Sequence, residues 1–264
     1  MSLIGRHDNA FTNLRRAAVI GRRNGAIGYL NSDWGDGGHP QPLAVSYAPF
    51  LVGAAVSWCA DSYDESLLAP VLNRDVFQDR AGLIAQAALA LGIAHRKFKY
   101  TAPNVTPFGA TIAAPPPRLR ELFCRDGLKY FARIAGKNVK SALEEVETQR
   151  AILSRSRPAT PSAGVLGFEL DLAARMAAES CRFMLWQQAV AAGNHSKARD
   201  LAHRGVARLR DLEKRYYEYW PTRNRGTPKK YWPFLKWRLR DYQRGTLPIP
   251  QHIAAVERRS TSAD

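Results

Sequence analysis

The residues best suited to chemistry lie near the start of the chain, where Asp33, Trp34, Asp36 and His39 stand among glycines too small to cover them. An exposed indole beside carboxylates suits a carbohydrate. The apolar face of a pyranose ring stacks on the aromatic ring while the sugar hydroxyls donate to carboxylate oxygens. His39 either belongs to this site or holds its glycine-rich loop in place. The same residue types also favour a tight turn, so two interpretations remain open.

The flanking sequence predicts a helix, a strand, a loop and a second helix. Residues 9–20 carry apolar side chains at helical intervals, and the glycine-rich segment Gly25–Gly28 ends that helix. Tyr29–Asn31 is then predicted to be a short strand, and residues 42–58 an apolar, alanine-rich helix. In a parallel barrel the active site gathers at the carboxyl ends of the strands, and residues 33–39 follow this strand directly.

Segments within the first sixty residues resemble a known family. Gly5–Asn9, Gly25–Leu43 and Gly53–Trp58 are similar to the end of the catalytic barrel in bacterial family-20-like glycoside hydrolases, which are relatives of β-N-acetylhexosaminidases. A second element, Tyr216–Arg225, resembles the aromatic-Trp-x-x-Arg-Asn-Arg segment near the carboxyl end of that family. The resemblance therefore brackets most of the chain.

The resemblance implies particular roles for the residues in the glycine-rich loop. In the family, the last barrel strand ends in a Trp-Gly-acid element, whose Trp forms part of the sugar pocket wall and whose acid binds ring hydroxyls. By position these residues are Trp34 and Asp36, with Asp33 and His39 as further substrate contacts. The implied activity is hydrolysis of N-acetylhexosamine-type glycosides without a cofactor.

The catalytic acid pair of the family is missing from the expected place. That pair is a consecutive Asp-Glu on an earlier barrel strand, and it supports hydrolysis assisted by the acetamido group of the substrate. The only Asp-Glu here is Asp64–Glu65, in a polar stretch where Ser62 or Asp64 is expected to cap a helix. Asp33 and Asp36 are too close in sequence to flank a glycosidic bond. We therefore expect no catalytic residue in this chain, which alone would be inactive.

Chain length indicates an incomplete barrel. A complete (β/α)8 barrel takes about 250 residues, and only about the first sixty residues have an α/β pattern. The predicted fold is mainly α: residues 1–60 form the last helix–strand–helix unit of a TIM barrel, residues 61–250 a carboxyl-terminal helical bundle, and residues 251–264 a flexible tail. We expect a carboxyl-terminal portion of a longer protein, without a signal peptide, whose partners are the sugar substrate and a complementary barrel fragment.

Helical periodicity dominates beyond residue 60. Proline-rich residues 103–117 are predicted to be an ordered connector, and apolar stripes predict long helices over 128–146, 166–186 and 196–219. The aromatic residues in these stripes are interpreted as core. Arg223–Arg225, directly after the third stripe, either cap its last carbonyl groups or dock the helical region onto the barrel.

The positive charge favours an alternative function. The chain has 39 Lys and Arg against 23 Asp and Glu, and residues 229–240 interleave aromatic and basic side chains as single-strand binders do. A basic helical protein that binds nucleic acid or another polyanion is therefore the second hypothesis. The competing interpretation is a solvated helix face, because acidic residues recur within the same helices.

Cysteine and histidine usage points to no metal or cofactor. The three cysteines are widely separated and lack a Cys-x-x-Cys motif, which indicates reduced thiols and a cytoplasmic location. The histidines show no metal-ligand spacing. No stretch of about eighteen residues was expected to be apolar enough to span a membrane.

Overall fold

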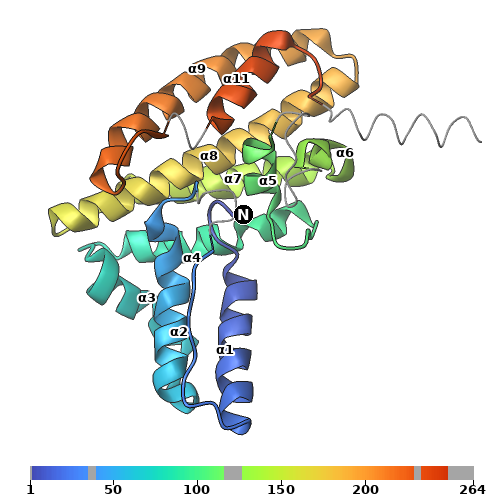
Figure 1. Ribbon diagram of the computed structural model, residues 1–264. Helices are drawn as coiled ribbons and strands as arrows, with labels where there is room; N and C mark the ends of the chain where they lie inside the picture. The colour runs from blue at the N-terminus through green and yellow to red at the C-terminus, as the bar shows by residue number, and fades with distance from the viewer. Residues whose placement is uncertain (1, 35–39, 116–126, 229–232, 249–264) are drawn as a thin grey trace, which may run out of the picture. The chain divides into compact units, whose positions relative to one another are not determined.

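The computed structural model describes residues 2–34, 40–115, 127–228 and 233–248 (Figure 1). These residues are mostly helical and include no β-strand, which confirms the prediction of a mainly α protein. Two isolated β-bridges, Asp79 with Pro158 and Ala102 with Val105, lie outside the helices. The chain divides into two compact units, unit 1 (residues 1–2, 96–144 and 175–264) and unit 2 (residues 3–95 and 145–174).

Unit 2 is built around a helical hairpin. Its elements are α1 (His7–Arg23), η1 (Leu43–Ser46), α2 (Tyr47–Cys59), η2 (Ala60–Ser62), η3 (Glu65–Leu67), α3 (Leu68–Val71), η4 (Leu72–Phe77) and α4 (Leu83–Ile93). Parts of α7 (Gly136–Leu153) and α8 (Pro161–Ala191) complete it, since both helices contribute residues to each unit.

The α1–α2 hairpin begins with a well-defined helix end. Gly25 has a φ of +78°, its N–H donates to the carbonyl of Arg22, and the N–H of Ala26 donates to that of Gly21. This is the Schellman arrangement, which requires a left-handed residue just after the helix and therefore favours glycine. The helix end expected at Gly25 is confirmed. Helix α2 then packs against α1 and buries Ala48, Val52 and Val56.

Unit 1 is a helical bundle. Apart from its parts of α7 and α8, it contains α5 (Pro107–Ala113), η6 (Gly127–Lys129), α6 (Tyr130–Arg133), α9 (His195–Tyr219), η7 (Trp220–Thr222) and α11 (Phe234–Arg244). η5 (Ala94–Phe98) links the two units along the chain. Contacts of Glu179 with Arg208 and of Arg175 with Asp211 show that α8 and α9 run antiparallel, as expected for long helices joined by a short turn.

The structure corrects three sequence predictions. Tyr29–Asn31 is not a strand, because a strand is defined by hydrogen bonds to a partner and the described residues provide none. The predicted connector contains helix α5, whose first residue is Pro107 and whose N-cap is Thr106. The helix predicted over 128–146 is interrupted near Ile134, where the backbone is extended between α6 and α7.

Two further expectations have separate outcomes. The domain boundary expected at residue 60 lies inside unit 2 and stays a prediction. The tail expected over residues 251–264 lies outside the described residues.

By length and composition, Leu43–Ser62 could cross a membrane, contrary to the expectation that no stretch of the chain is apolar enough. A single stretch of this kind is weak evidence, so we assign it no membrane role.

Candidate functional site

Alternate residues of the segment that follows α1 form hydrogen bonds with helix α2. The hydroxyl of Tyr29 donates to the carbonyl of Gly53 at 2.9 Å, and the side-chain amide of Asn31 donates to the carbonyl of Pro49 at 3.5 Å. Gly53 allows this approach, since a Cβ there would lie 2.1 Å from the Asn31 amide nitrogen. The odd-numbered residues thus fix the segment to the helix.

Asp33 continues the same pattern. Its carboxylate accepts a hydrogen bond of 2.5 Å from the hydroxyl of Ser46, which lies in η1 just before α2. This contact turns the carboxylate toward η1. Asp33 therefore helps to hold the loop that carries the other predicted sugar contacts.

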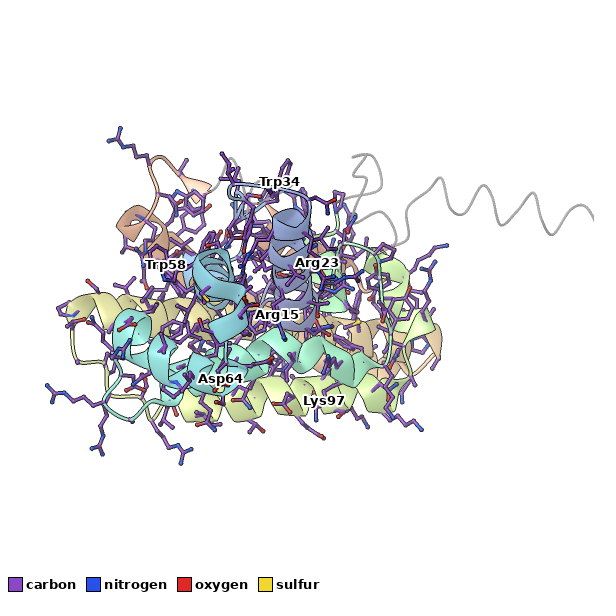
Figure 2. The ribbon with its side chains drawn as sticks, turned by 90° about the horizontal axis from the view of Figure 1, so that it is seen from below. Arg15, Arg23, Trp34, Trp58, Asp64 and Lys97 are labelled. Atoms are coloured by element: carbon purple, nitrogen blue, oxygen red, sulfur yellow. The ribbon has the colours of Figure 1, made fainter. Side chains whose placement is uncertain are left out.

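The even-numbered residues of this segment point to solvent. Leu30 is 87% exposed and Trp34 is 77% exposed, and the indole N–H of Trp34 donates to the hydroxyl of Ser32 at 2.9 Å. Figure 2 labels Trp34 together with Trp58, which is 93% exposed on α2. An indole held by one hydrogen bond with its ring uncovered is suited to stacking on an apolar ligand face.

The other two predicted sugar contacts cannot be placed. Asp36 and His39 lie outside the described residues. Of the predicted sugar contacts, the structure therefore describes Asp33 and Trp34, which are neighbours on one short segment and both exposed.

The second motif of the resemblance lies in unit 1 and is divided between core and surface. Tyr216 is buried against Trp220 and Phe234, with ring centroids 5.7 and 6.2 Å apart, as expected for a core aromatic. Asn224 donates its backbone and side-chain N–H groups to the carbonyl of Trp220, which is the capping role expected for this element. Arg223 and Arg225 are exposed.

The Asp64–Glu65 pair has the structural role expected for it. The Asp64 carboxylate accepts from the N–H of Ser66 at 2.8 Å and caps η3, and hydrogen bonding to the Ser66 side chain and backbone lowers the pKa of Asp64. Glu65 lies 3.8 Å from Arg15 in an exposed ion pair. A capping carboxylate with a lowered pKa is a poor proton donor at neutral pH, so neither residue is a candidate acid.

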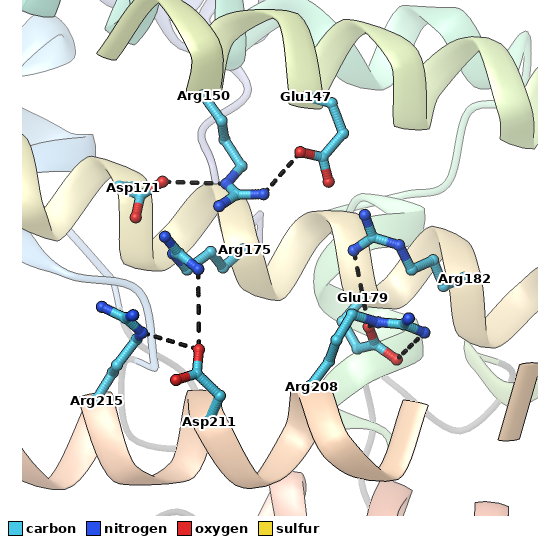
Figure 3. A network of polar contacts seen from close by, with 9 residues as sticks. All are labelled: Glu147, Arg150, Asp171, Arg175, Glu179, Arg182, Arg208, Asp211 and Arg215. Carbon is cyan, nitrogen blue, oxygen red and sulfur yellow. Dashed lines mark hydrogen bonds and ion pairs between the residues drawn. The ribbon is translucent and has the colours of Figure 1, made fainter. Parts of the chain in front are cut away.

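Sequence reasoning missed a buried carboxylate in unit 1. Glu179 is 1% exposed, accepts a hydrogen bond from Arg208 at 2.5 Å and lies 3.8 Å from Arg182 (Figure 3). It also accepts a hydrogen bond from the hydroxyl of Tyr242 at 2.8 Å. Burial raises the pKa of Glu179, and the Arg208 guanidinium opposes that shift. The signal that could have revealed Glu179 is its position three residues after Met176 and four before Phe183, which puts a charge on an apolar helical stripe.

A second buried charge in unit 1 lies on α11. Arg238 is 1% exposed, donates to the carbonyl of Thr111 at 2.9 Å, and lies 3.0 Å from the carboxylate of Asp241. Its guanidinium also lies 5.1 Å from the centre of the Phe183 ring. These contacts pair the buried charges within the bundle, so we interpret both clusters as structural.

In unit 2, a smaller ionic cluster joins α7 and α8. Arg150 donates to Glu147 at 2.7 Å and to Asp171 at 3.0 Å (Figure 3). Nowhere in the described part of the chain do three or more His, Cys, Asp or Glu side chains gather as potential ligands of one metal ion. The segment 28–34 is therefore the best candidate for a ligand-binding role.

Comparison with known proteins identified no relative. No protein-family model, no curated protein and no solved structure matches this chain.

Proposed function

We propose that this chain is the carboxyl-terminal part of a glycoside hydrolase similar to β-N-acetylhexosaminidases. In this proposal it supplies the last helix–strand–helix unit of a TIM barrel and contacts the sugar through Trp34 and Asp36. The catalytic Asp-Glu pair belongs to barrel strands on a complementary fragment. The chain alone is inactive, and hydrolysis of N-acetylhexosaminides requires the completed barrel.

The observation that supports this proposal is the alternation along residues 29–34. In a (β/α)8 barrel, successive side chains of a strand point in turn to the surrounding helix and to the barrel interior. Tyr29, Asn31 and Asp33 hydrogen-bond to α2 or η1, whereas Leu30 and Trp34 are 87% and 77% exposed. In the proposed barrel, Trp34 would therefore face the pocket at the carboxyl end of the segment.

The first test is the DNA sequence upstream of the Met1 codon. We expect several hundred codons to encode the missing barrel strands, one of them bearing a consecutive Asp-Glu. An unrelated gene or stop-rich sequence would contradict the proposal and favour a free-standing helical protein.

The second test measures sugar binding in the completed protein. Saturation-transfer NMR should show the acetyl methyl signal of N-acetylglucosamine in the presence of this chain and the upstream-encoded polypeptide. Trp34→Ala should abolish the signal, because the stacking surface is lost. Trp58→Ala is the matched control, since Trp58 is even more exposed yet lies on α2, and it should retain the signal. Equal signals from both variants would refute the assigned role of Trp34.

The charge distribution favours a second candidate function, polyanion binding by unit 1. Unit 1 contains 29 Lys and Arg against 11 Asp and Glu, whereas unit 2 has 10 against 12. The whole positive excess therefore lies in unit 1. Several of its cations are already paired with carboxylates, among them Arg204 with Asp200 and Arg215 with Asp211. This pairing makes polyanion binding the weaker of the two candidates.

A further inference from the structure

Unpaired positive charge of unit 1 gathers on α9 and α11. Arg199, Arg210, Arg240 and Arg244 are exposed, and no carboxylate among the described residues forms an ion pair with any of them. The carboxylates of these two helices already form ion pairs with other cations: Asp200 with Arg204, Asp211 with Arg215, Glu213 with Lys236, Glu218 with Lys214, and Asp241 with Arg238. The pairing of those cations therefore leaves the four arginines available to a ligand.

Helical spacing places the arginines of each helix on one side of it. Arg199 and Arg210 lie eleven residues apart on α9, which is close to three full turns. Arg240 and Arg244 lie four residues apart on α11, which is about one turn. Each helix thus presents two guanidinium groups in the same direction.

An ion pair between the helices brings these two sides together. Glu213, one turn after Arg210, lies 3.4 Å from Lys236, one turn before Arg240. The helices run side by side in Figure 1, and residues one turn apart share a helix face, so the faces that carry Arg210 and Arg240 are adjacent. We call the surface formed by the four arginines the basic face; it extends about 16 Å along α9.

The composition of the basic face indicates which kind of partner fits it. None of the large hydrophobic side chains that are exposed among the described residues lies on α9 or α11. A protein interface has an apolar core, and a helix that binds a lipid surface inserts apolar side chains into it. The phosphate backbone of a nucleic acid requires only cations and hydrogen-bond donors. The basic face therefore fits a nucleic acid better than a protein or a membrane.

The aromatic residues of α11 favour a duplex over a single strand. Single strands bind by stacking their bases on exposed aromatic rings. Phe234 is buried against Tyr216, and Trp237 is half-buried, so neither ring is fully open for stacking. About 16 Å of a B-form duplex carries about ten phosphate groups, which is enough to pair with all four arginines.

We propose that the basic face of unit 1 binds the phosphate backbone of double-stranded nucleic acid, without regard to base sequence. This inference rests on the second candidate function, polyanion binding by unit 1, and assigns to it a surface and a class of ligand. The guanidinium groups of the basic face donate to phosphate oxygens and displace the counterions of the duplex.

The salt dependence of duplex binding tests this inference. The full chain is titrated into a labelled DNA duplex of about 20 base pairs, and fluorescence anisotropy is followed over a range of salt concentrations. Four phosphate contacts should make the logarithm of the association constant fall with the logarithm of the salt concentration with a slope of about −4. A single strand of the same length should bind more weakly.

A pair of double variants locates the binding surface. Arg210→Gln combined with Arg240→Gln removes two contacts, so the slope should become less steep by about 2 and binding at low salt should weaken by at least about tenfold. Lys137→Gln combined with Lys140→Gln is the matched control, because it removes the same charge from two exposed lysines of unit 1 on α7 and should keep the parent slope. All four side chains are exposed, so both double variants should melt like the parent chain.

Four results would overturn the inference, and they separate its failure from that of the candidate function. Equal effects of the two double variants would leave polyanion binding in place but remove it from the basic face. Tighter binding of the single strand would make that strand the ligand. Binding to vesicles of phosphatidylserine and phosphatidylcholine, but not to the duplex, would make the partner a lipid surface. Binding to none of these three ligands would refute polyanion binding by unit 1 as well.

Discussion

His7 shows how one buried side chain makes unit 2 sensitive to acid. Its ring stacks on Phe11 with a centroid distance of 5.1 Å and lies against Gly92, where an added Cβ would be 1.8 Å from the ring. Burial lowers the pKa of His7 to about 4, although the backbone of Val45 and the carboxylate of Asp8 oppose the shift. His7 is therefore neutral in the folded protein at neutral pH.

The pH dependence of stability follows from this shift. The unfolded chain binds a proton at His7 below its ordinary value of about 6.5, whereas the folded protein does so only near 4. Stability should therefore fall by about 3 kcal/mol between these values as the pH decreases. The titratable groups facing this site are Asp8 and His95, which lie 3.4 Å apart.

Denaturation by urea at pH 7.5, 5.5 and 4.5 checks the prediction. His7→Gln should lose much of the pH dependence, because it removes the titrating group. His203→Gln, at an exposed histidine, should behave like the parent chain. If His7→Gln and the parent lose the same stability on acidification, buried His7 does not cause the acid sensitivity.

Asp79 organises helix α4 at the scale of a secondary-structure element. Its carboxylate accepts hydrogen bonds from the N–H groups of Leu83, Ile84 and Ala81, and from that of Arg157, which is 78 residues away in sequence. Burial opposes ionisation, but these four donors lower the pKa of Asp79 below its ordinary value. One carboxylate thus caps α4 and fixes the turn before α8.

Asp79→Ala should therefore be strongly destabilising. It leaves four N–H groups without this acceptor, the buried one of Ile84 among them, and we expect a loss of about 2–4 kcal/mol in the free energy of unfolding. Asp75→Ala is the control, because Asp75 bonds only its exposed neighbour Arg74 and should cost less than about 0.5 kcal/mol. Equal losses in chemical denaturation of both variants would contradict the capping role.

Helix α11 is held in unit 1 by Tyr242. Its ring packs against Phe183 and Trp186 at centroid distances of 5.2 and 5.1 Å, and its hydroxyl donates to Glu179. Gly205 on α9 makes room for the ring, since a Cβ there would lie 2.3 Å from it. The side chain thus links three helices of the same unit.

Tyr242→Phe should remove one hydrogen bond to a buried carboxylate while keeping the ring. We expect a loss of about 1–3 kcal/mol in stability, because the acceptor is charged and fully buried. Tyr217→Phe, on the same bundle but half-buried, should change stability by less than about 0.5 kcal/mol. A thermal melt in which the two variants coincide would show that the Tyr242 hydroxyl is unimportant.

At the scale of the whole molecule, charge and exposed apolar surface are segregated. The large hydrophobic side chains that are most exposed in the described residues, Ile27, Leu30, Trp34 and Trp58, belong to unit 2. The net positive charge belongs to unit 1. The two candidate functions therefore make separable predictions.

Fluorescence anisotropy with a labelled single-stranded oligonucleotide tests the charge of unit 1. We expect weak binding, with a Kd of about 10⁻⁴ to 10⁻⁶ M that rises steeply with salt, as for nonspecific electrostatic association. Trp34→Ala should leave this binding unchanged. Tight binding that persists at high salt would instead make nucleic acid the principal ligand.

Local features of the fold follow from the sequence alone. The helix end at Gly25 and the N-cap at Asp64 depend on neighbouring residues, and the structure confirms both. Helical periodicity likewise predicted a mainly α protein. Such features need only backbone conformations and short-range hydrogen bonds, which a few adjacent residues determine.

The tertiary structure alone decided features that join residues distant in sequence. Glu179 with Tyr242, and Asp79 with the backbone of Arg157, are hydrogen-bonded pairs that no local pattern marks. The same reason explains why Tyr29–Asn31 has the alternation of a strand without being one. Side-chain orientation depends on the chain itself, whereas a strand exists only when another strand supplies the hydrogen bonds.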